Sequence, residues 1–144
     1  MDKKLPNAKS ERVAGERETL RRVVARRNLT GLANDTKWDE FIAAMRARAG
    51  WRPRFRVTCI DGAPSGWDAE WFYHQPFPQI SLEWLDVAYL QQMSDRRLPP
   101  RQTTIDHSDW IEAALRSAGL DYRKGPTMIR IFGYAPRGED LFED

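Results

Sequence analysis

The stretch RFRVTCIDGAPSGWDAEWFYHQPFPQISLEWLDV, residues 54–87, decides the fold class of this chain. Within it, apolar and polar side chains alternate over three segments, as they do in a β-strand with one solvated face. These segments are residues 54–60, 67–74 and 80–87. The turn-forming run DGAPSG joins the first two, and the prolines of QPFP interrupt the second because proline cannot donate to a β-ladder. The pattern predicts a three-stranded antiparallel meander.

Helical patterns flank this region on both sides. Upstream, Asp35 or Thr36 is placed to cap a helix over residues 37–49, in which Trp, Phe, Ile and Met recur on one face. Downstream, a second amphipathic helix ends at Gly119, and residues 127–134 alternate as a further strand.

These elements predict an α+β fold, with a small antiparallel sheet of about four strands and helices packed on one face. Residues 88–104 contain paired prolines among arginines and are expected to form a long exposed loop. Residues 1–34 are expected to form a basic arm, a basic N-terminal helix over residues 11–27 and a linker. Residues 35–134 then form a single α+β domain, and residues 135–144 an acidic tail.

Composition agrees with one soluble domain. The chain has 144 residues, of which 41% are hydrophobic and 31% charged, and a chain of this size buries about two-thirds of its surface on folding. Its single cysteine, Cys59, cannot close an intramolecular disulfide, and no charged segment followed by an apolar run opens the sequence. No stretch approaches the ~20 apolar residues of a membrane span. We therefore expect a cytoplasmic protein without a membrane partner.

Motifs for metal or cofactor chemistry are missing from the sequence. Besides Cys59, the candidate zinc ligands are two histidines, His74 and His107, and none of the three stands at a zinc-binding spacing. No glycine-rich phosphate loop and no G-x-S-x-G elbow occurs. We therefore expect no cofactor, and no residue is assigned a catalytic or metal-binding role.

The run WDAEWFYH, residues 67–74, followed by LEWLD, residues 82–86, resembles a family of small bacterial proteins catalogued as a domain of unknown function. The tryptophan-led helix start at residues 37–41 and the closing IRIFGY, residues 129–134, fit the same pattern. The resemblance covers residues 35–134 and leaves the basic N-terminal extension outside it. It implies no activity.

The leading hypothesis is a non-enzymatic interaction module, of the immunity or accessory type, that binds a basic protein. The acidic and aromatic strands and the small size are similar in style to bacterial toxin-immunity proteins. Six tryptophans are many for a chain of this length, and Trp is a typical interface anchor, although a tryptophan-rich core is the alternative. The partner-binding residues are expected on one sheet face: Asp68, Glu70, Trp71, His74, Glu83, Trp84 and Asp86.

Two other functions remain open. Residues 1–56 carry a net charge of +8 and residues 57–144 one of −6, so the basic front also suits nucleic acid. That function would use four arginines of the N-terminal helix: Arg21, Arg22, Arg26 and Arg27. A hydrolase is the other possibility, because Glu70 and Glu83 on paired strands would form a carboxylate pair of the kind used in acid–base catalysis. Strand order and oligomeric state are not determined by the sequence.

Overall fold

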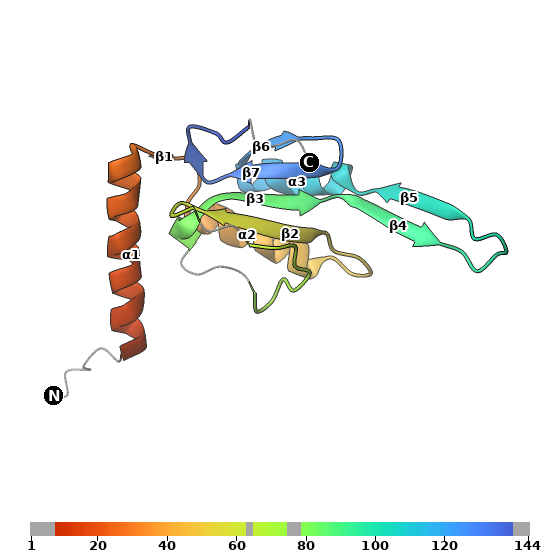
Figure 1. Ribbon diagram of the computed structural model, residues 1–144, viewed down its shortest axis with the longest axis horizontal. Helices are drawn as coiled ribbons and strands as arrows, with labels where there is room; N and C mark the ends of the chain where they lie inside the picture. The colour runs from red at the N-terminus through yellow and green to blue at the C-terminus, as the bar shows by residue number, and fades with distance from the viewer. Residues whose placement is uncertain (1–7, 63–64, 75–78, 140–144) are drawn as a thin grey trace.

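An antiparallel four-stranded sheet forms the centre of the molecule (Figure 1). The computed structural model describes residues 8–62, 65–74 and 79–139. The strands lie in the order β2–β3–β7–β6, and each neighbouring pair is antiparallel. Their bounds are β2 Arg54–Cys59, β3 Leu82–Ala88, β7 Met128–Phe132 and β6 Asp121–Lys124. The predicted α+β class is therefore confirmed.

Helices α2 (Asp35–Ala47) and α3 (Ser108–Ala118) cover one face of this sheet (Figure 1). Asn34 rather than Asp35 or Thr36 caps α2, because its side chain accepts a hydrogen bond from the backbone N–H of Lys37 at 2.9 Å. Helix α3 ends at Gly119 with φ 73°, the left-handed conformation that glycine adopts without steric cost. Both helices pack on the sheet through one apolar core, which includes Trp38, Phe41, Met45, Ile111, Leu115, Phe55, Val57, Leu85 and Ile131.

Helix α1 (Ala8–Arg27) stands at one end of the sheet, away from that core (Figure 1). A two-residue ladder between β1 (Thr30–Gly31) and β8 (Tyr134–Ala135) follows it. Among the described α1 side chains only Val23 is buried, in a small cluster with Leu29, Ile60 and Tyr134. None of the described helices has both the length and the apolar composition needed to span a bilayer.

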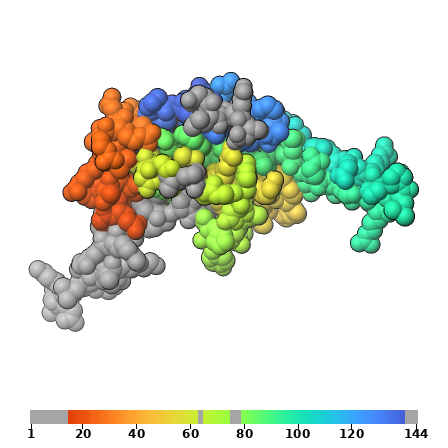
Figure 2. Space-filling model, in the orientation of Figure 1, coloured from red at the N-terminus to blue at the C-terminus, as the bar shows by residue number. Residues whose placement is uncertain are grey.

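A hairpin of β4 (Leu90–Ser94) and β5 (Gln102–Asp106) extends away from the body (Figures 1 and 2). A loop is expected over residues 88–104. That prediction is wrong for residues 90–94 and 102–104, which form strands on either side of the proline-rich turn. The side chains of this hairpin are exposed on both faces from residue 92 onward. A strand without a buried face has no apolar period, which is why the alternation test missed it.

The strand expected over residues 67–74 is also wrong, and with it the three-stranded meander. Only Asp68 forms a β-bridge there, to Phe55, and residues 71–73 form a turn. Strand β2 instead pairs directly with β3, with Val57 opposite Leu85. The proline run at 75–78, the N-terminal residues 1–7 and the end of the acidic tail lie outside the described residues.

Candidate functional site

Residues 65–74, here called the aromatic loop, cross the edge of β2 and expose three aromatic side chains. Trp67, Phe72 and Tyr73 are 37%, 48% and 87% exposed. Trp71 anchors the loop, because it is only 1% exposed and its Nε1 donates to the carbonyl of Pro53 at 2.8 Å. One buried tryptophan thus holds its neighbours out in solvent. The loop stands out at the lower edge of the space-filling view (Figure 2).

Four arginines frame these exposed rings. The guanidinium carbons of Arg54 and Arg56 lie 5.8 and 4.7 Å from the Trp67 ring centroid. Those of Arg46 and Arg52 lie 5.5 and 5.3 Å from the Phe72 ring centroid. Each such cation–π contact contributes about 0.5–1 kcal/mol at an exposed site, so the arginines and rings hold one another in place.

Backbone hydrogen bonds fix two of these arginines independently of the rings. Nε of Arg46 donates to the carbonyl of Trp71 at 2.8 Å, and Nε of Arg52 donates to the carbonyl of Met45 at 3.0 Å. Within the part of the chain that the structure describes, Arg46, Arg52 and Arg54 form no ion pair with a carboxylate. Their charge is therefore available to a partner.

The carboxylates of the aromatic loop shape the loop itself. Oδ1 of Asp68 accepts from the backbone N–H of Glu70 at 2.8 Å, and its Oδ2 lies 2.8 Å from Nδ1 of His74. The backbone hydrogen bond from Glu70, followed by the interaction with His74, holds the pKa of Asp68 below its ordinary value. Glu70 in turn accepts from the N–H of Phe72 at 2.7 Å.

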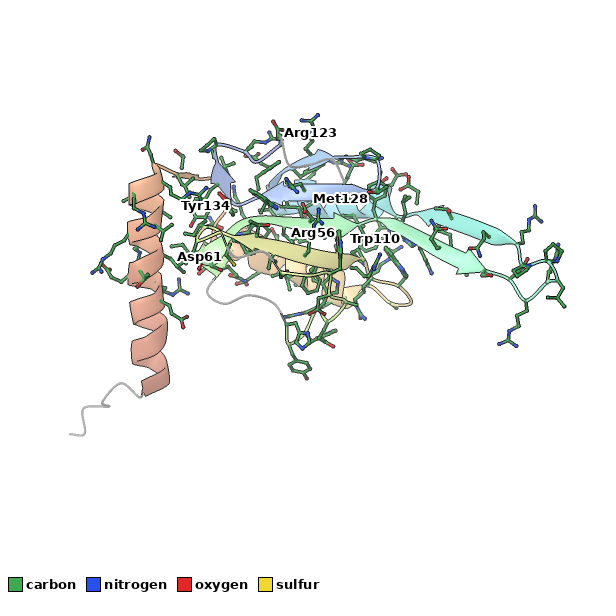
Figure 3. All side chains as sticks on the ribbon, in the orientation of Figure 1. Arg56, Asp61, Trp110, Arg123, Met128 and Tyr134 are labelled. Carbon is green, nitrogen blue, oxygen red and sulfur yellow. The ribbon has the colours of Figure 1, made fainter. Side chains whose placement is uncertain are left out.

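A cavity of about 330 Å³ adjoins Trp67 on the sheet face that the helices leave uncovered. Its lining includes Arg54, Arg56, Trp67, Met128 and the start of β4. Arg56 reaches across this face, with Nη2 3.6 Å from Sδ of Met128 (Figure 3). The aromatic loop therefore combines a protruding ring, Tyr73, with an arginine-lined hollow.

Below the cavity, Asp86 joins two arginines in a buried ion-pair cluster. Its Oδ2 lies 2.9 Å from Nε of Arg56, and its Oδ1 lies 2.8 Å from Nε of Arg130. Asp86 is 0% and Arg130 2% exposed. The cluster spans β2, β3 and β7 in one register row, so it fixes the face on which the cavity lies.

The family model described as "Family of unknown function (DUF6678)" matches residues 20–138. The chain belongs to this family. The match includes the aromatic loop, the four-stranded sheet, the β4–β5 hairpin and residues 20–27 of α1. No curated protein and no solved structure matches the chain.

In this DUF6678 protein, the seven residues predicted to bind a partner do not share one exposed sheet face. The expected placement of these residues is therefore wrong. Trp71, Glu83 and Asp86 are buried, at 1%, 6% and 0% exposure. Glu83 forms an ion pair with Arg27 at 2.7 Å. Trp84 is 8% exposed. Arginines that are distant in the sequence neutralise Glu83 and Asp86. Because each pair is so far apart in the sequence, no local pattern shows the pairing.

The other three predicted residues lie together in the aromatic loop. Asp68 and His74 form a pair there, and Glu70 caps the following turn. These three side chains keep part of their surface in solvent. Their contact with a partner stays a prediction.

The residues of the two alternative functions are placed differently. Arg21, Arg22 and Arg26 are exposed on α1, whereas Arg27 is bound to Glu83 and to the carbonyl of Ile60. Glu70 and Glu83, the predicted hydrolase pair, are held by different partners, Glu70 within the loop and Glu83 by α1. Among the described residues, no group of three or more His, Cys, Asp and Glu side chains is arranged to hold a metal ion.

Sequence reasoning missed the arginines of the site. Residues 46–56 read RARAGWRPRFR, in which arginine alternates with aromatic and small residues. The pattern predicts a helix end and a strand for this run, although arginine beside aromatic residues is also the composition of an interface. Its spacing alone could not show that Arg46 and Arg52 meet the same ring, Phe72.

Proposed function

We propose that this protein is a non-enzymatic interaction module that binds an acidic protein through its aromatic loop. The observation that carries the proposal is the exposure of Trp67, Phe72 and Tyr73 in one short loop framed by arginines. Trp, Tyr and Arg dominate binding energy at protein interfaces. Exposed apolar surface that is rimmed by polar side chains marks sites of protein interaction.

The charge of the loop favours an acidic rather than a basic partner. Asp68 and Glu70 are occupied with hydrogen bonds inside the loop. Arg46, Arg52 and Arg54 present their guanidiniums beside the rings. A carboxylate-bearing partner meets complementary charge here, whereas a basic partner meets repulsion. We also propose that the protein acts in the cytoplasm, in an immunity or accessory role.

The test is affinity purification of the tagged full-length protein from its native cells, with nuclease treatment, followed by mass spectrometry. Tyr73→Ala is the informative variant, because Tyr73 is 87% exposed and its loss leaves the core intact. An interface anchor contributes ~2 kcal/mol or more, which is about 30-fold in Kd. We expect an acidic protein that wild-type chain retains and Tyr73→Ala loses.

The matched control is Leu98→Ala, which truncates another highly exposed side chain, 95% in solvent, at the far end of the β4–β5 hairpin. This control should retain the acidic protein. Equal recovery by the wild type and Tyr73→Ala, or recovery of basic proteins only, would contradict the proposal.

Nucleic-acid binding through α1 is the second candidate function. Arg21 and Arg26 are exposed and form no ion pair among the described residues, and Arg22 meets only Glu18, at 3.8 Å. Removal of three phosphate-contacting arginines reduces the slope of log K against log salt by about three. A salt titration of Arg21→Ala/Arg22→Ala/Arg26→Ala measures this change, and an unchanged slope removes the candidate.

A further inference from the structure

The β4–β5 hairpin, here called the arm, projects from the body as a two-stranded ribbon (Figures 1 and 2). Each strand has five residues, which corresponds to about 17 Å at the usual rise per residue. An isolated two-stranded hairpin is only marginally stable in water. A projecting arm therefore needs a firm base.

The base of the arm is a fixed aromatic cluster around His107. The His107 ring stacks on Trp51 with centroids 4.0 Å apart. Nε1 of Trp110 lies 2.9 Å from Nδ1 of His107 (Trp110 in Figure 3). On the other side of the ring, Nε2 of His107 lies 2.8 Å from Oε1 of Gln91 in β4. An indole nitrogen only donates, so Nδ1 accepts and Nε2 donates to Gln91. These contacts set the direction of the arm.

The tip of the arm, residues 95–101, is organised by one carboxylate. Oδ1 of Asp95 accepts from the backbone N–H groups of Arg97 and Arg101 at 3.1 and 2.8 Å. Asp95 also donates its own N–H to the carbonyl of Arg101 at 3.0 Å. This closed tip leaves Leu98 95% exposed at its apex. Arg96, Arg97 and Arg101 are exposed around it, and Nε of Arg97 lies 3.7 Å from Oδ2 of Asp95, so the tip carries three positive charges against one negative charge.

The strands of the arm carry almost no negative charge outward. Their exposed side chains are mainly uncharged polar groups: Gln92, Ser94, Gln102, Thr103 and Thr104. Asp106, the other carboxylate of the arm, accepts from the N–H of Ser108 at 2.8 Å at the base. The hydrogen bonds from Ser108 hold the pKa of Asp106 below its ordinary value. Positive charge is thus concentrated at the apex, around an aliphatic side chain.

We propose that the arm binds duplex DNA by placing its arginine tip in the minor groove, with Leu98 as an intercalating wedge. Minor-groove proteins use arginine in the groove and insert an aliphatic or proline side chain between base steps. Here Leu98 precedes two prolines, Pro99 and Pro100, and three arginines lie beside them. A minor groove about 6 Å wide admits such a tip but not a helix.

A protein pocket fits the tip less well than DNA does. Anchors at protein interfaces combine arginine with aromatic residues, and the tip sequence DRRLPPR contains arginine but no aromatic residue. Three arginines around one leucine instead match a polyanion. Narrow A·T-rich grooves attract arginine, and flexible pyrimidine–purine steps open most readily for a wedge. The preferred site is therefore A·T-rich with a central TA step. This binding goes beyond the proposed protein interaction and does not depend on it.

The experiment measures binding of the full-length protein to a fluorescently labelled A·T-rich duplex by anisotropy, over a range of salt concentrations. The test variant is Arg96→Ala/Arg97→Ala/Arg101→Ala. We expect at least tenfold weaker binding and a salt slope reduced by about two to three. The control variant, Arg116→Ala/Arg123→Ala/Arg137→Ala, removes the same number of exposed positive charges from the body of the molecule. Equal loss in both would show a general charge effect and overturn the arm proposal.

A second variant, Leu98→Ser, separates the wedge from the charge. We expect it to keep the salt slope of the wild type but to lose DNA bending, measured by energy transfer between dyes at the duplex ends. A minor-groove ligand such as netropsin should compete with the wild type. Undetectable binding at low salt, bending by Leu98→Ser equal to wild type, or indifference to netropsin would each overturn the proposal. We expect these arm variants to retain the acidic protein. A failure of the DNA proposal is therefore distinguishable from a failure of the proposed protein interaction.

Discussion

Replacing Asp86 by asparagine removes one buried charge and almost no volume. Asp86 is 0% exposed and lies 2.8 Å from Nε of Arg130, whose side chain is 2% exposed, while Nη2 of Arg130 lies 3.1 Å from the second oxygen. Arg56, the other neighbour, keeps 23% of its side chain in solvent. The variant therefore leaves the Arg130 guanidinium buried opposite a neutral amide. Breaking a buried pair in this way costs about 3–5 kcal/mol.

Urea unfolding measures this loss, as a lower midpoint with an unchanged m-value. A chain of this length loses roughly 2–4 °C of Tm per kcal/mol, so melting should fall by about 10 °C. Arg21→Gln, which removes an exposed charge on α1, should stay within about 0.5 kcal/mol of the wild type. Pairing Asp86→Leu with Arg130→Met should recover stability, since apolar replacements of buried ion pairs are often neutral. An Asp86→Asn variant within about 1 kcal/mol of the wild type would refute the reasoning.

Two further predictions concern the arm base and the sheet. Burial, and secondarily Arg48, hold the pKa of His107 below its ordinary value of 6.5, despite the opposing effect of Asp106. The unfolded chain therefore binds the proton more tightly, so His107 stabilises the fold fully above pH 6.5 and loses that contribution as the pH falls. His107→Gln should flatten this part of the profile of urea midpoint against pH, and an unchanged profile would contradict the assignment. Gly133→Ala should destabilise by about 1–3 kcal/mol, because a Cβ there collides with the carbonyl oxygen of Leu82. A melting temperature equal to the wild type would count against the close approach.

The elements with one buried face could be predicted from the sequence. Helix α2 follows from Trp38, Phe41 and Met45, and β2 from the alternation that buries Phe55 and Val57. An element that packs one face on a core acquires a period of 3.6 or 2 in its sequence. The arm has no such face, so its strands carried no signal.

The alternation at residues 67–74 was misleading for a different reason. Trp71 is buried, whereas Trp67 and Tyr73 on the same predicted face are exposed. A period-two pattern does not show which strand a segment will pair with. In the structure β3 pairs with β2 along its length, and residues 67–74 add only the bridge between Asp68 and Phe55. The segment therefore became a loop held by one tryptophan.

The predicted acidic face failed because charge partners are set by the tertiary fold. Asp86 and Arg130 are separated by 44 residues, and Glu83 and Arg27 by 56. The sequence shows the carboxylates but not which arginines will neutralise them. The sequence places partner-binding residues in the segment after Trp67, whereas the exposed chemistry there is that of aromatic rings and arginines.

The central claim is that the aromatic loop and the arginines that frame it bind an acidic protein. Its most direct test is a calorimetric titration of the captured partner against two charge-reversal variants, Arg54→Glu in β2 beside the loop and Arg116→Glu on α3, both of which are exposed positions. We predict at least 30-fold weaker binding by Arg54→Glu, about 2 kcal/mol, and wild-type affinity for Arg116→Glu. Equal affinity of the two variants would contradict the account.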